Sequence, residues 1–303
     1  MITNRIIAAT LPLALLCFGC GTHSTGNGSD KLDIVVSIPP QKYLVESIGG
    51  KFVNVESVMT SDANPESFEP TVASMRAISE ADLYIPVGLL DFEQPLVAKL
   101  HVNTPDLEIA TLLDDITLLY DTHGECEHRC DDADGHHHHG DAADPHVWSS
   151  VRNMRTMARN LTDLLIDNDS VHAEYYVARR DSMINRLDSI ENVLAERIGN
   201  SGQTSFMVWH PSLSYLANDY GLSQIVVGSH AKELSVKQLQ KRIDEAATSG
   251  VNLFFIQQEF DSNQASTLNE HVNARLVELN TMNGDWESEI KKIADGFAGE
   301  KNN

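Results

Sequence analysis

The sequence predicts an α/β fold of two lobes, each a mostly parallel sheet flanked by helices, bridged by one long helix. Apolar, strand-like runs alternate with helical patterns in both halves of the chain, which is typical of parallel sheets with helices on their faces. Between the halves, residues 173–198 contain neither Gly nor Pro and keep their apolar side chains near one face. A helix of that length extends about 39 Å, which is enough to span two domains.

The first half is predicted to alternate strands and helices from residue 32 onward. Residues 32–38 (LDIVVSI) are a continuous apolar run rich in β-branched side chains, which suits a buried parallel strand, and Pro39 ends it. Val72, Met75 and Ile78 recur at helical spacing. The predicted strands are 32–38, 53–59, 83–87 and 107–110, and the predicted helices are 43–48, 71–81 and 94–100.

The second half begins with helices and then returns to the alternation. Ser149 or Ser150 is suited to cap a helix whose apolar stripe runs from Val151 to Leu165, and residues 167–170 interrupt it. The predicted strands are 205–209, 224–227, 253–256 and 275–279, and the predicted helices are 212–219, 235–248 (capped by Ser235), 262–272 and 286–297. The predicted domains are an N-terminal lobe at 32–171, a bridging helix at 172–199 and a C-terminal lobe at 200–303.

The amino terminus is predicted to be a lipoprotein signal peptide over residues 1–20. Arg5 supplies a positive charge, and the apolar run 6–16 is too short to cross about 30 Å of hydrocarbon. Gly19 before Cys20 resembles a lipobox, in which the cysteine is lipidated and becomes the first mature residue. A flexible tether follows at 21–31. We therefore expect a periplasmic or cell-envelope protein with a lipid anchor on Cys20.

The charge of the chain argues against one class of partner. The formal net charge is -22 at pH 7. Binding to nucleic acid or to an anionic membrane surface needs a basic face for the phosphates, so neither is expected. The same charge is compatible with attracting cations.

Residues 123–142 hold the densest group of metal-ligand side chains. Imidazole and thiolate favour zinc and copper over magnesium or calcium, while the interspersed acids and glycines indicate a solvated loop. We expect this loop to collect loosely held metal through an auxiliary set of histidines: His123, His128, His136, His137, His138 and His139. Its cysteines, Cys126 and Cys130, could form a disulfide or bind zinc.

Three candidate ligands lie at comparable places in the predicted fold. Glu66 comes after strand 53–59, His146 ends the first half, and His210 directly follows strand 205–209. Ligands of open α/β sheets bind outside the carboxyl ends of strands, so a cleft between the lobes would bring all three together. Two imidazoles and a carboxylate suit zinc. Each residue alone could equally be a solvated or hydrogen-bonded loop side chain.

The motifs around these residues resemble those of the ZnuA/TroA-like metal-binding lipoproteins, the zinc and manganese receptors of bacterial ABC transporters. Residues 64–70 (NPESFEP), 144–148 (DPHVW) and 206–210 (FMVWH) are similar to the family's first, second and third ligand motifs. The family usually has His in place of Glu66. The resemblance covers nearly all of the mature chain and implies two α/β lobes joined by a single long helix.

The resemblance implies a metal site in the interlobe cleft, made by His146, His210 and Glu66. The family's last ligand is often an Asp, and Asn280 takes that place here, although an amide oxygen is a weak zinc ligand. Glu259 is an alternative source of the missing carboxylate. A set richer in oxygen would favour manganese, whereas the histidine-rich loop favours zinc.

The function implied is that of an extracytoplasmic substrate-binding protein, not an enzyme, which captures Zn²⁺ and delivers it to an ABC-transporter permease. We expect a monomer whose partners are the divalent ion, the permease and the membrane that holds its lipid anchor. A manganese receptor of the same type is the alternative. A zinc-dependent hydrolase is a different class, against which the absence of H-E-x-x-H and G-x-S-x-G motifs argues. A passive metal buffer or an adhesin is a third.

Overall fold

Two parallel sheets with helices on their faces organise the chain in the computed structural model, which describes residues 31–65, 67–120, 142–228, 236–258 and 268–299. The predicted signal peptide, the tether apart from Lys31, and the histidine-rich loop apart from Ala142 lie outside these residues. Within them, no helix has both the length and the apolar composition needed to cross a bilayer.

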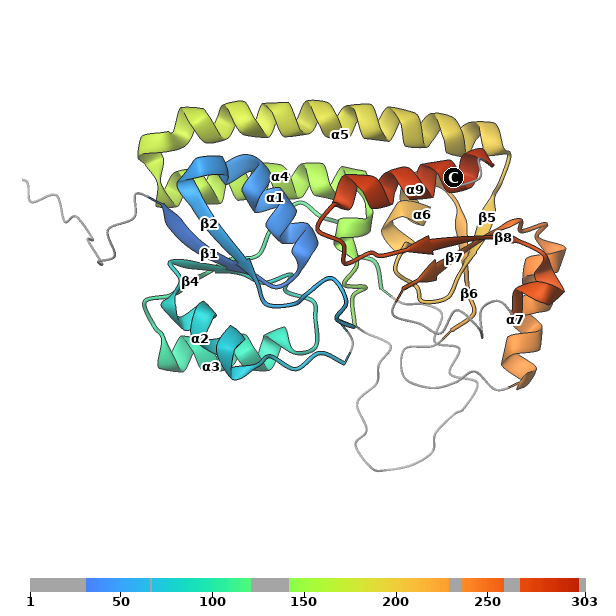
Figure 1. The fold of residues 1–303 in the computed structure, drawn as a ribbon, viewed down its shortest axis with the longest axis horizontal. Coiled ribbons are helices and arrows are strands. Elements are labelled where there is room, and N and C mark those ends of the chain that lie inside the picture. Colours follow the sequence, from blue (N-terminus) through green and yellow to red (C-terminus); the bar gives the residue numbers. More distant parts are fainter. Residues whose placement is uncertain (1–30, 66, 121–141, 229–235, 259–267, 300–303) are drawn as a thin grey trace, which may run out of the picture. The chain divides into compact units, whose positions relative to one another are not determined.

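The N-terminal sheet is entirely parallel, with strand order β2-β1-β3-β4 (Figure 1). Its central strand is buried because it pairs on both sides: Ile34 lies opposite Val55 on one neighbour and Leu83 on the other. The strands are β1 (Leu32–Val36), β2 (Val53–Ser57), β3 (Leu83–Ile85) and β4 (Glu108–Ile109), and the helices between them are α1 (Pro39–Gly49), α2 (Val72–Glu80) and α3 (Glu93–Asn103).

Helix α1 begins earlier than the predicted span of 43–48. It starts at Pro39, because a proline in the first helical turn gives up only an N–H that has no partner inside the helix. The Gln41 side chain accepts from the backbone N–H groups of Ser37 and Ile38, at 3.1 and 3.3 Å. The strand ends at Val36, two residues before its predicted end, and Pro39 and Pro40 begin the helix, which the prediction missed.

The C-terminal sheet repeats the same topology, with strand order β6-β5-β7-β8 and all pairs parallel. In both sheets the chain adds its second strand on one side of the first strand and its third strand on the other side. In such folds the ligand binds at this switch point. The strands are β5 (Ser205–Val208), β6 (Ser223–Val226), β7 (Leu253–Gln257) and β8 (Arg275–Leu279), and the helices are α6 (Ser214–Tyr220), α7 (Val236–Thr248), α9 (Trp286–Ala298) and a helical stretch at 268–272.

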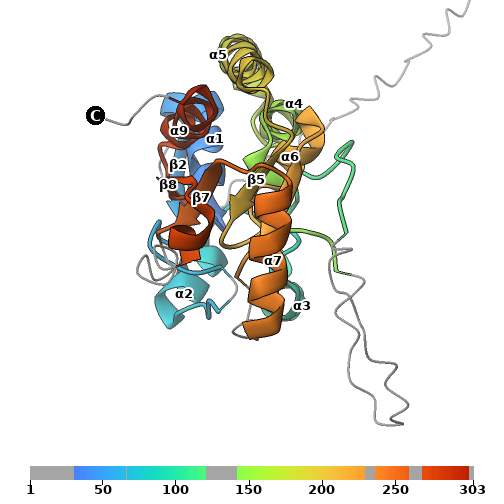
Figure 2. The ribbon, with the colours of Figure 1, turned by 90° about the vertical axis from the view of Figure 1, so that its right-hand side faces the viewer.

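Helix α5 (Ala173–Ser201) is the predicted bridging helix, and it ends at Gly202, whose φ of 67° suits glycine. It packs against α1 and α4 (Val151–Asn168) of the first lobe and against α9 of the second. Figures 1 and 2 show it running along this helical layer. The side chains that it buries all belong to the predicted apolar face: Tyr176, Met183, Leu187, Leu194 and Ile198. One hydrophobic core contains residues of both lobes as a result.

Candidate metal centre

Two imidazoles from different halves of the sequence meet at the centre of the described site. The Nε2 atoms of His146 and His210 lie 3.2 Å apart, and the rings meet edge to face. The side chains are only 2% and 4% exposed. Two ring nitrogens that face each other at this distance repel unless a proton or a cation lies between them. The pair is therefore suited to hold a positive ion.

Asp144 holds His146 in one orientation. One carboxylate oxygen, Oδ1, accepts both the backbone N–H and the Nδ1–H of His146, each at 2.8 Å. With Nδ1 protonated, the lone pair of the neutral ring lies on Nε2, which is the nitrogen that faces His210. Burial acts to raise the pKa of Asp144, but the hydrogen bonds from His146, together with the charge of that ring when it is protonated, outweigh burial, so that the pKa lies below its ordinary value.

Gln257 holds the backbone of His210. His210 comes two residues after β5, and Gln257 is the last residue of the neighbouring strand β7, so both lie at the carboxyl edge of the sheet. The fully buried Gln257 amide accepts the His210 N–H at 3.1 Å and donates to the His210 carbonyl at 2.7 Å. Its second N–H donates to Ser212 Oγ. The amide thus fixes the loop from which the imidazole projects.

The segment around His146 is fastened to elements of the C-terminal lobe. The Tyr215 hydroxyl on α6 donates to the Asp144 carbonyl at 2.8 Å. The indole of Trp148 donates to the Thr281 carbonyl, and the indole of Trp286 donates to the Trp148 carbonyl, both at 2.8 Å. Burial raises the pKa of Tyr215 to about 12, so its hydroxyl is a neutral donor at physiological pH. The two histidines therefore belong to one rigid block.

The geometry of the pair fits a tetrahedral ion. Zinc–nitrogen bonds are about 2.05 Å long, and two of them span the 3.2 Å separation at an N–Zn–N angle of about 103°. The remaining positions of a tetrahedron would be filled by ligands outside the pair. Within the residues that the structure describes, no group of three or more His, Cys, Asp or Glu side chains is arranged for a metal ion.

The structure describes only one of the other predicted ligands, Asn280. Glu66 and Glu259, like the auxiliary histidines and Cys20, lie outside the described residues. Asn280 follows β8 directly, and its side chain makes hydrogen bonds to Met282, Ser61 and Gln258. The sequence prediction also missed the supporting residues. The role of Asp144 could have been predicted, because an acid two residues before a histidine can reach its ring, whereas no sequence signal points to Gln257.

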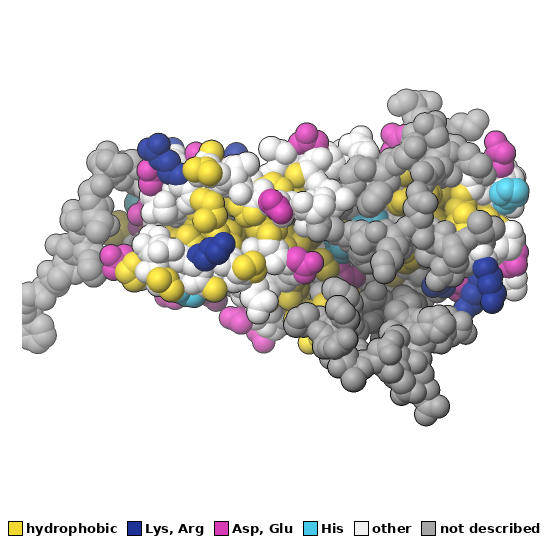
Figure 3. All heavy atoms as spheres, turned by 90° about the horizontal axis from the view of Figure 1, so that it is seen from below, with side chains coloured by type: hydrophobic (Ala, Val, Ile, Leu, Met, Phe, Trp, Pro, Cys, Tyr) yellow, Lys and Arg dark blue, Asp and Glu magenta, His cyan; other side chains and the backbone are white. Residues whose placement is uncertain are grey.

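Acidic and basic side chains are mixed on the visible surface of the described residues. Figure 3 shows one face of the molecule, on which the acidic and basic side chains that are visible are scattered among apolar ones. The sequence contains twice as many acidic residues, 44, as Lys and Arg, 22. This balance favours the approach of a cation over that of an anion.

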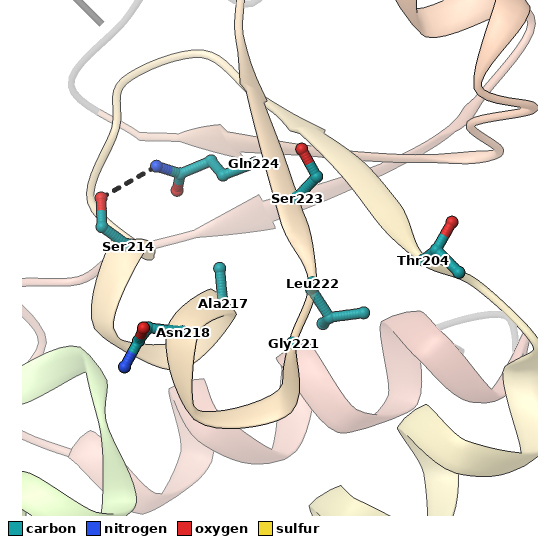
Figure 4. A pocket seen from close by; sticks show the side chains of 8 residues that line it. All are labelled: Thr204, Ser214, Ala217, Asn218, Gly221, Leu222, Ser223 and Gln224. Atoms are coloured by element: carbon teal, nitrogen blue, oxygen red, sulfur yellow. Dashed lines mark hydrogen bonds between the residues drawn. The ribbon is translucent and has the colours of Figure 1, made fainter. Parts of the chain in front are cut away.

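A hollow beside α6 has the wrong chemistry for a metal. It has a volume of about 360 Å³. Figure 4 shows Gln224 of β6 reaching across it to Ser214, with which it makes a 3.0 Å hydrogen bond. Only neutral side chains line it: Thr204, Ser214, Ala217, Asn218, Gly221, Leu222, Ser223 and Gln224. The histidine pair is therefore the stronger candidate for a cation site.

Fold and site together are typical of a two-lobed binding protein with a candidate cation site beside the carboxyl edge of its second sheet. The family of zinc-uptake complex component A, periplasmic (ZnuA), has a model that matches residues 34–295. The chain belongs to this family. Membership makes it an extracytoplasmic solute-binding protein and not an enzyme. This agrees with the predicted binding function and with the prediction that the chain is not an enzyme.

Individual relatives agree with this assignment. A protein of Treponema pallidum (strain Nichols), provisionally named as metal-binding, is 25% identical over 289 residues, which cover 93% of this chain and 90% of that protein. The zinc-binding lipoprotein AdcA of Streptococcus pneumoniae is 24% identical and covers 92% of this chain, but this chain spans only 55% of AdcA.

Solved structures of the family match the fold. A crystal structure of ZnuA has a TM-score of 0.78 at 28% identity and covers 89% of this chain and 99% of its own. A ZnuA mutant lacking its residues 138–173, with zinc bound, has a TM-score of 0.77 at 29% identity and covers 89% of this chain and 97% of its own. The predicted fold class is confirmed.

Proposed function

We propose that this chain captures Zn²⁺ outside the cytoplasm and hands it to the membrane permease of an ABC transporter. The observation that carries the proposal is the buried pair of Nε2 atoms 3.2 Å apart, one of them oriented by a carboxylate. A carboxylate that orients a metal-binding histidine is a common feature of zinc sites. The zinc-binding names of its relatives support the same cargo.

We propose His146 and His210 as the two nitrogen ligands and Glu66 as the carboxylate ligand. Glu259 is the candidate for the fourth position, since the side-chain amide of Asn280 is already engaged in hydrogen bonds to Ser61, Gln258 and Met282. Two imidazoles and one carboxylate make a zinc site with one further position open, whereas a set with more oxygen ligands would suit manganese. Mn²⁺ is therefore the cargo against which zinc has to be tested.

The test is a competitive titration of Zn²⁺ against Mn²⁺ with the bound metal counted. The protein begins after residue 20 and is prepared with and without residues 123–142, because that loop would contribute weak sites of its own. We expect one tight zinc per chain in both forms. His210→Ala removes one of the two nitrogen ligands and should abolish tight binding in the form without the loop.

A surface histidine provides the matched control. His101 lies exposed near the end of α3, and His101→Ala should leave the tight zinc in place. Tight manganese with weak zinc would keep the type of receptor and change its cargo. No tight site in the protein without the loop would refute the proposal and leave the histidine-rich loop as the whole of the metal chemistry.

The finer predictions about the envelope belong to the same proposal. We propose that Cys20 carries a lipid anchor, that residues 123–142 collect zinc near the site, and that the protein works as a monomer. The lipoprotein AdcA supports the first of these. Metabolic labelling with a fatty acid, compared between the wild type and Cys20→Ala, tests it: label retained by the variant would refute it.

A further inference from the structure

Asn280 is held in a rigid turn at the end of β8. Its backbone N–H donates to Glu289 Oε2 at 2.9 Å, and its carbonyl accepts from the Asn283 N–H at 3.0 Å. Glu289 is a buried residue of α9, and its other oxygen accepts from Asn283 Nδ2 and Lys292 Nζ. The position of Asn280 is therefore determined by the C-terminal lobe alone.

The side chain of Asn280 reaches from this turn to the N-terminal lobe. Its Nδ2 donates to the Ser61 carbonyl at 3.0 Å and lies 3.2 Å from Gln258 Oε1, and its Oδ1 accepts the Met282 N–H at 2.9 Å. A backbone N–H only donates and a backbone carbonyl only accepts, so these two partners allow just one orientation of the amide. The side chain thus acts as a donor toward Ser61.

Ser61 belongs to the segment that leads from β2 to residue 66. The segment starts from the N-terminal lobe, where the Met59 N–H donates to the Ser37 carbonyl at 3.0 Å. The Ala63 N–H then donates to Thr60 within the segment itself. The histidine pair lies on a block that the C-terminal lobe holds, so the contact between Asn280 and Ser61 joins that block to the segment carrying the first ligand motif.

We propose that Asn280 is a positioning residue that joins the lobes and slows metal release, and that it is not itself a ligand. The inference rests on the proposed function. A hydrogen-bond donor at this position holds residues 60–65 against the C-terminal lobe while the histidine pair holds the ion. Without the donor, residues 60–65 would separate from the C-terminal lobe more often. The ion would then leave faster, although its two nitrogen ligands would be unchanged.

Asn280→Asp separates this role from ligation, because a positioning role predicts faster zinc release from this variant and a ligand role predicts slower release. Asn280→Asp replaces the donor by a carboxylate that repels the Ser61 carbonyl, but it would be a better metal ligand than the amide. Asn280→Ala removes both properties. We expect both variants to release zinc about 3- to 10-fold faster, which is the effect of one lost hydrogen bond, with little change in the association rate. Stopped-flow release into a chelator measures this in the mature chain.

Asn269 provides the matched control. Its amide also donates to one backbone carbonyl and accepts from one backbone N–H, both of Ala274, within the C-terminal lobe. Asn269→Asp should leave zinc release unchanged. Circular dichroism of each metal-free variant checks that it is folded.

Slower release or tighter zinc in Asn280→Asp would overturn the inference and make this position a ligand position. Unchanged release in Asn280→Asp and Asn280→Ala would also overturn it. His210→Ala separates this failure from that of the proposed function. If that variant keeps tight zinc, the histidine site itself is wrong. If it loses zinc while the Asn280 variants behave as wild type, only the positioning role is wrong.

Discussion

At the scale of the residue, the site depends on side chains that orient the two imidazoles. Asp144 and Gln257 fix the ring of His146 and the backbone of His210, respectively. A ligand that is already oriented loses little freedom when the metal binds, so these partners contribute to affinity without touching the ion.

Asp144→Asn is expected to weaken zinc binding about 10- to 100-fold, which is the usual effect of losing a partner that orients a ligand. The amide can keep the geometry but cannot supply the negative charge that raises the basicity of His146. Isothermal titration with a competing chelator measures the change. Asp82→Asn is the control: Asp82 accepts the Asp33 N–H at 2.9 Å on an exposed surface, and its loss should leave affinity unchanged.

The same aspartate should contribute to acid sensitivity. Its pKa is lowered in the folded protein, so the carboxylate stabilises the fold above the ordinary aspartate pKa of about 3.9, and this stabilisation is lost as pH falls through the lowered value. The difference in unfolding free energy between the metal-free wild type and Asp144→Asn should shrink as the pH falls below about 4. A difference that grows below about pH 4 would contradict the assignment.

At the scale of the element, α4 connects the site to the helical layer. Ser150 caps this helix by accepting the Asn153 N–H at 3.0 Å, and its hydroxyl donates to Asp219 on α6. Burial raises the pKa of Asp219, against the hydrogen bond from Ser150 and the charge of Arg152, so this contact lies in a partly desolvated place. One serine therefore both starts α4 and joins it to the C-terminal lobe.

Ser150→Ala should cost about 2–3 kcal/mol of unfolding free energy. The lost cap accounts for about 1 kcal/mol, and the lost hydrogen bond to the Asp219 carboxylate adds the remainder. Thr71→Ala is the matched control, because Thr71 caps α2 in the same way, by accepting the Ser74 N–H at 3.1 Å, but on an exposed surface. Chemical denaturation compares the two. Equal losses would mean that the contact with Asp219 contributes nothing.

At the scale of the whole molecule, α5 and the tryptophans keep the lobes in one core. Trp148 and Trp286 exchange indole hydrogen bonds with backbone carbonyls across the two halves, and Arg186 on α5 contacts Glu287 on α9 at 3.1 Å. A molecule connected in this way is expected to respond to an ion by local closure around the site, with limited movement of whole lobes.

Zinc should stabilise the whole molecule and not one lobe. At a free concentration 100 times its Kd, zinc adds about 2.7 kcal/mol to the unfolding free energy, which is a rise in Tm of about 4 °C for a chain of this size. Scanning calorimetry of the protein lacking residues 123–142 should show this rise in the wild type and in His101→Ala. A similar rise in His210→Ala would place the ion elsewhere.

Local pattern was sufficient for most of the fold. Continuous apolar runs predicted the ends of each described strand to within about two residues. A parallel strand that is buried on both faces requires such a run. The long helix was predictable because residues 173–198 keep their apolar side chains near one face and contain neither Gly nor Pro. The early start of α1 was missed because a proline after an apolar run is typical of the end of a strand, whereas Pro39 begins a helix here.

The sequence by itself determined the fold class and the motifs that carry His146 and His210, since strand ends and helix caps depend on neighbouring residues. Only the tertiary structure decided what those residues meet. His146 and His210 are 64 positions apart, and Asn280 is 219 positions from Ser61, so no local pattern encodes either contact. The orientation of an amide or an imidazole depends on donors and acceptors that folding brings together, and that is where the chemistry of this site was decided.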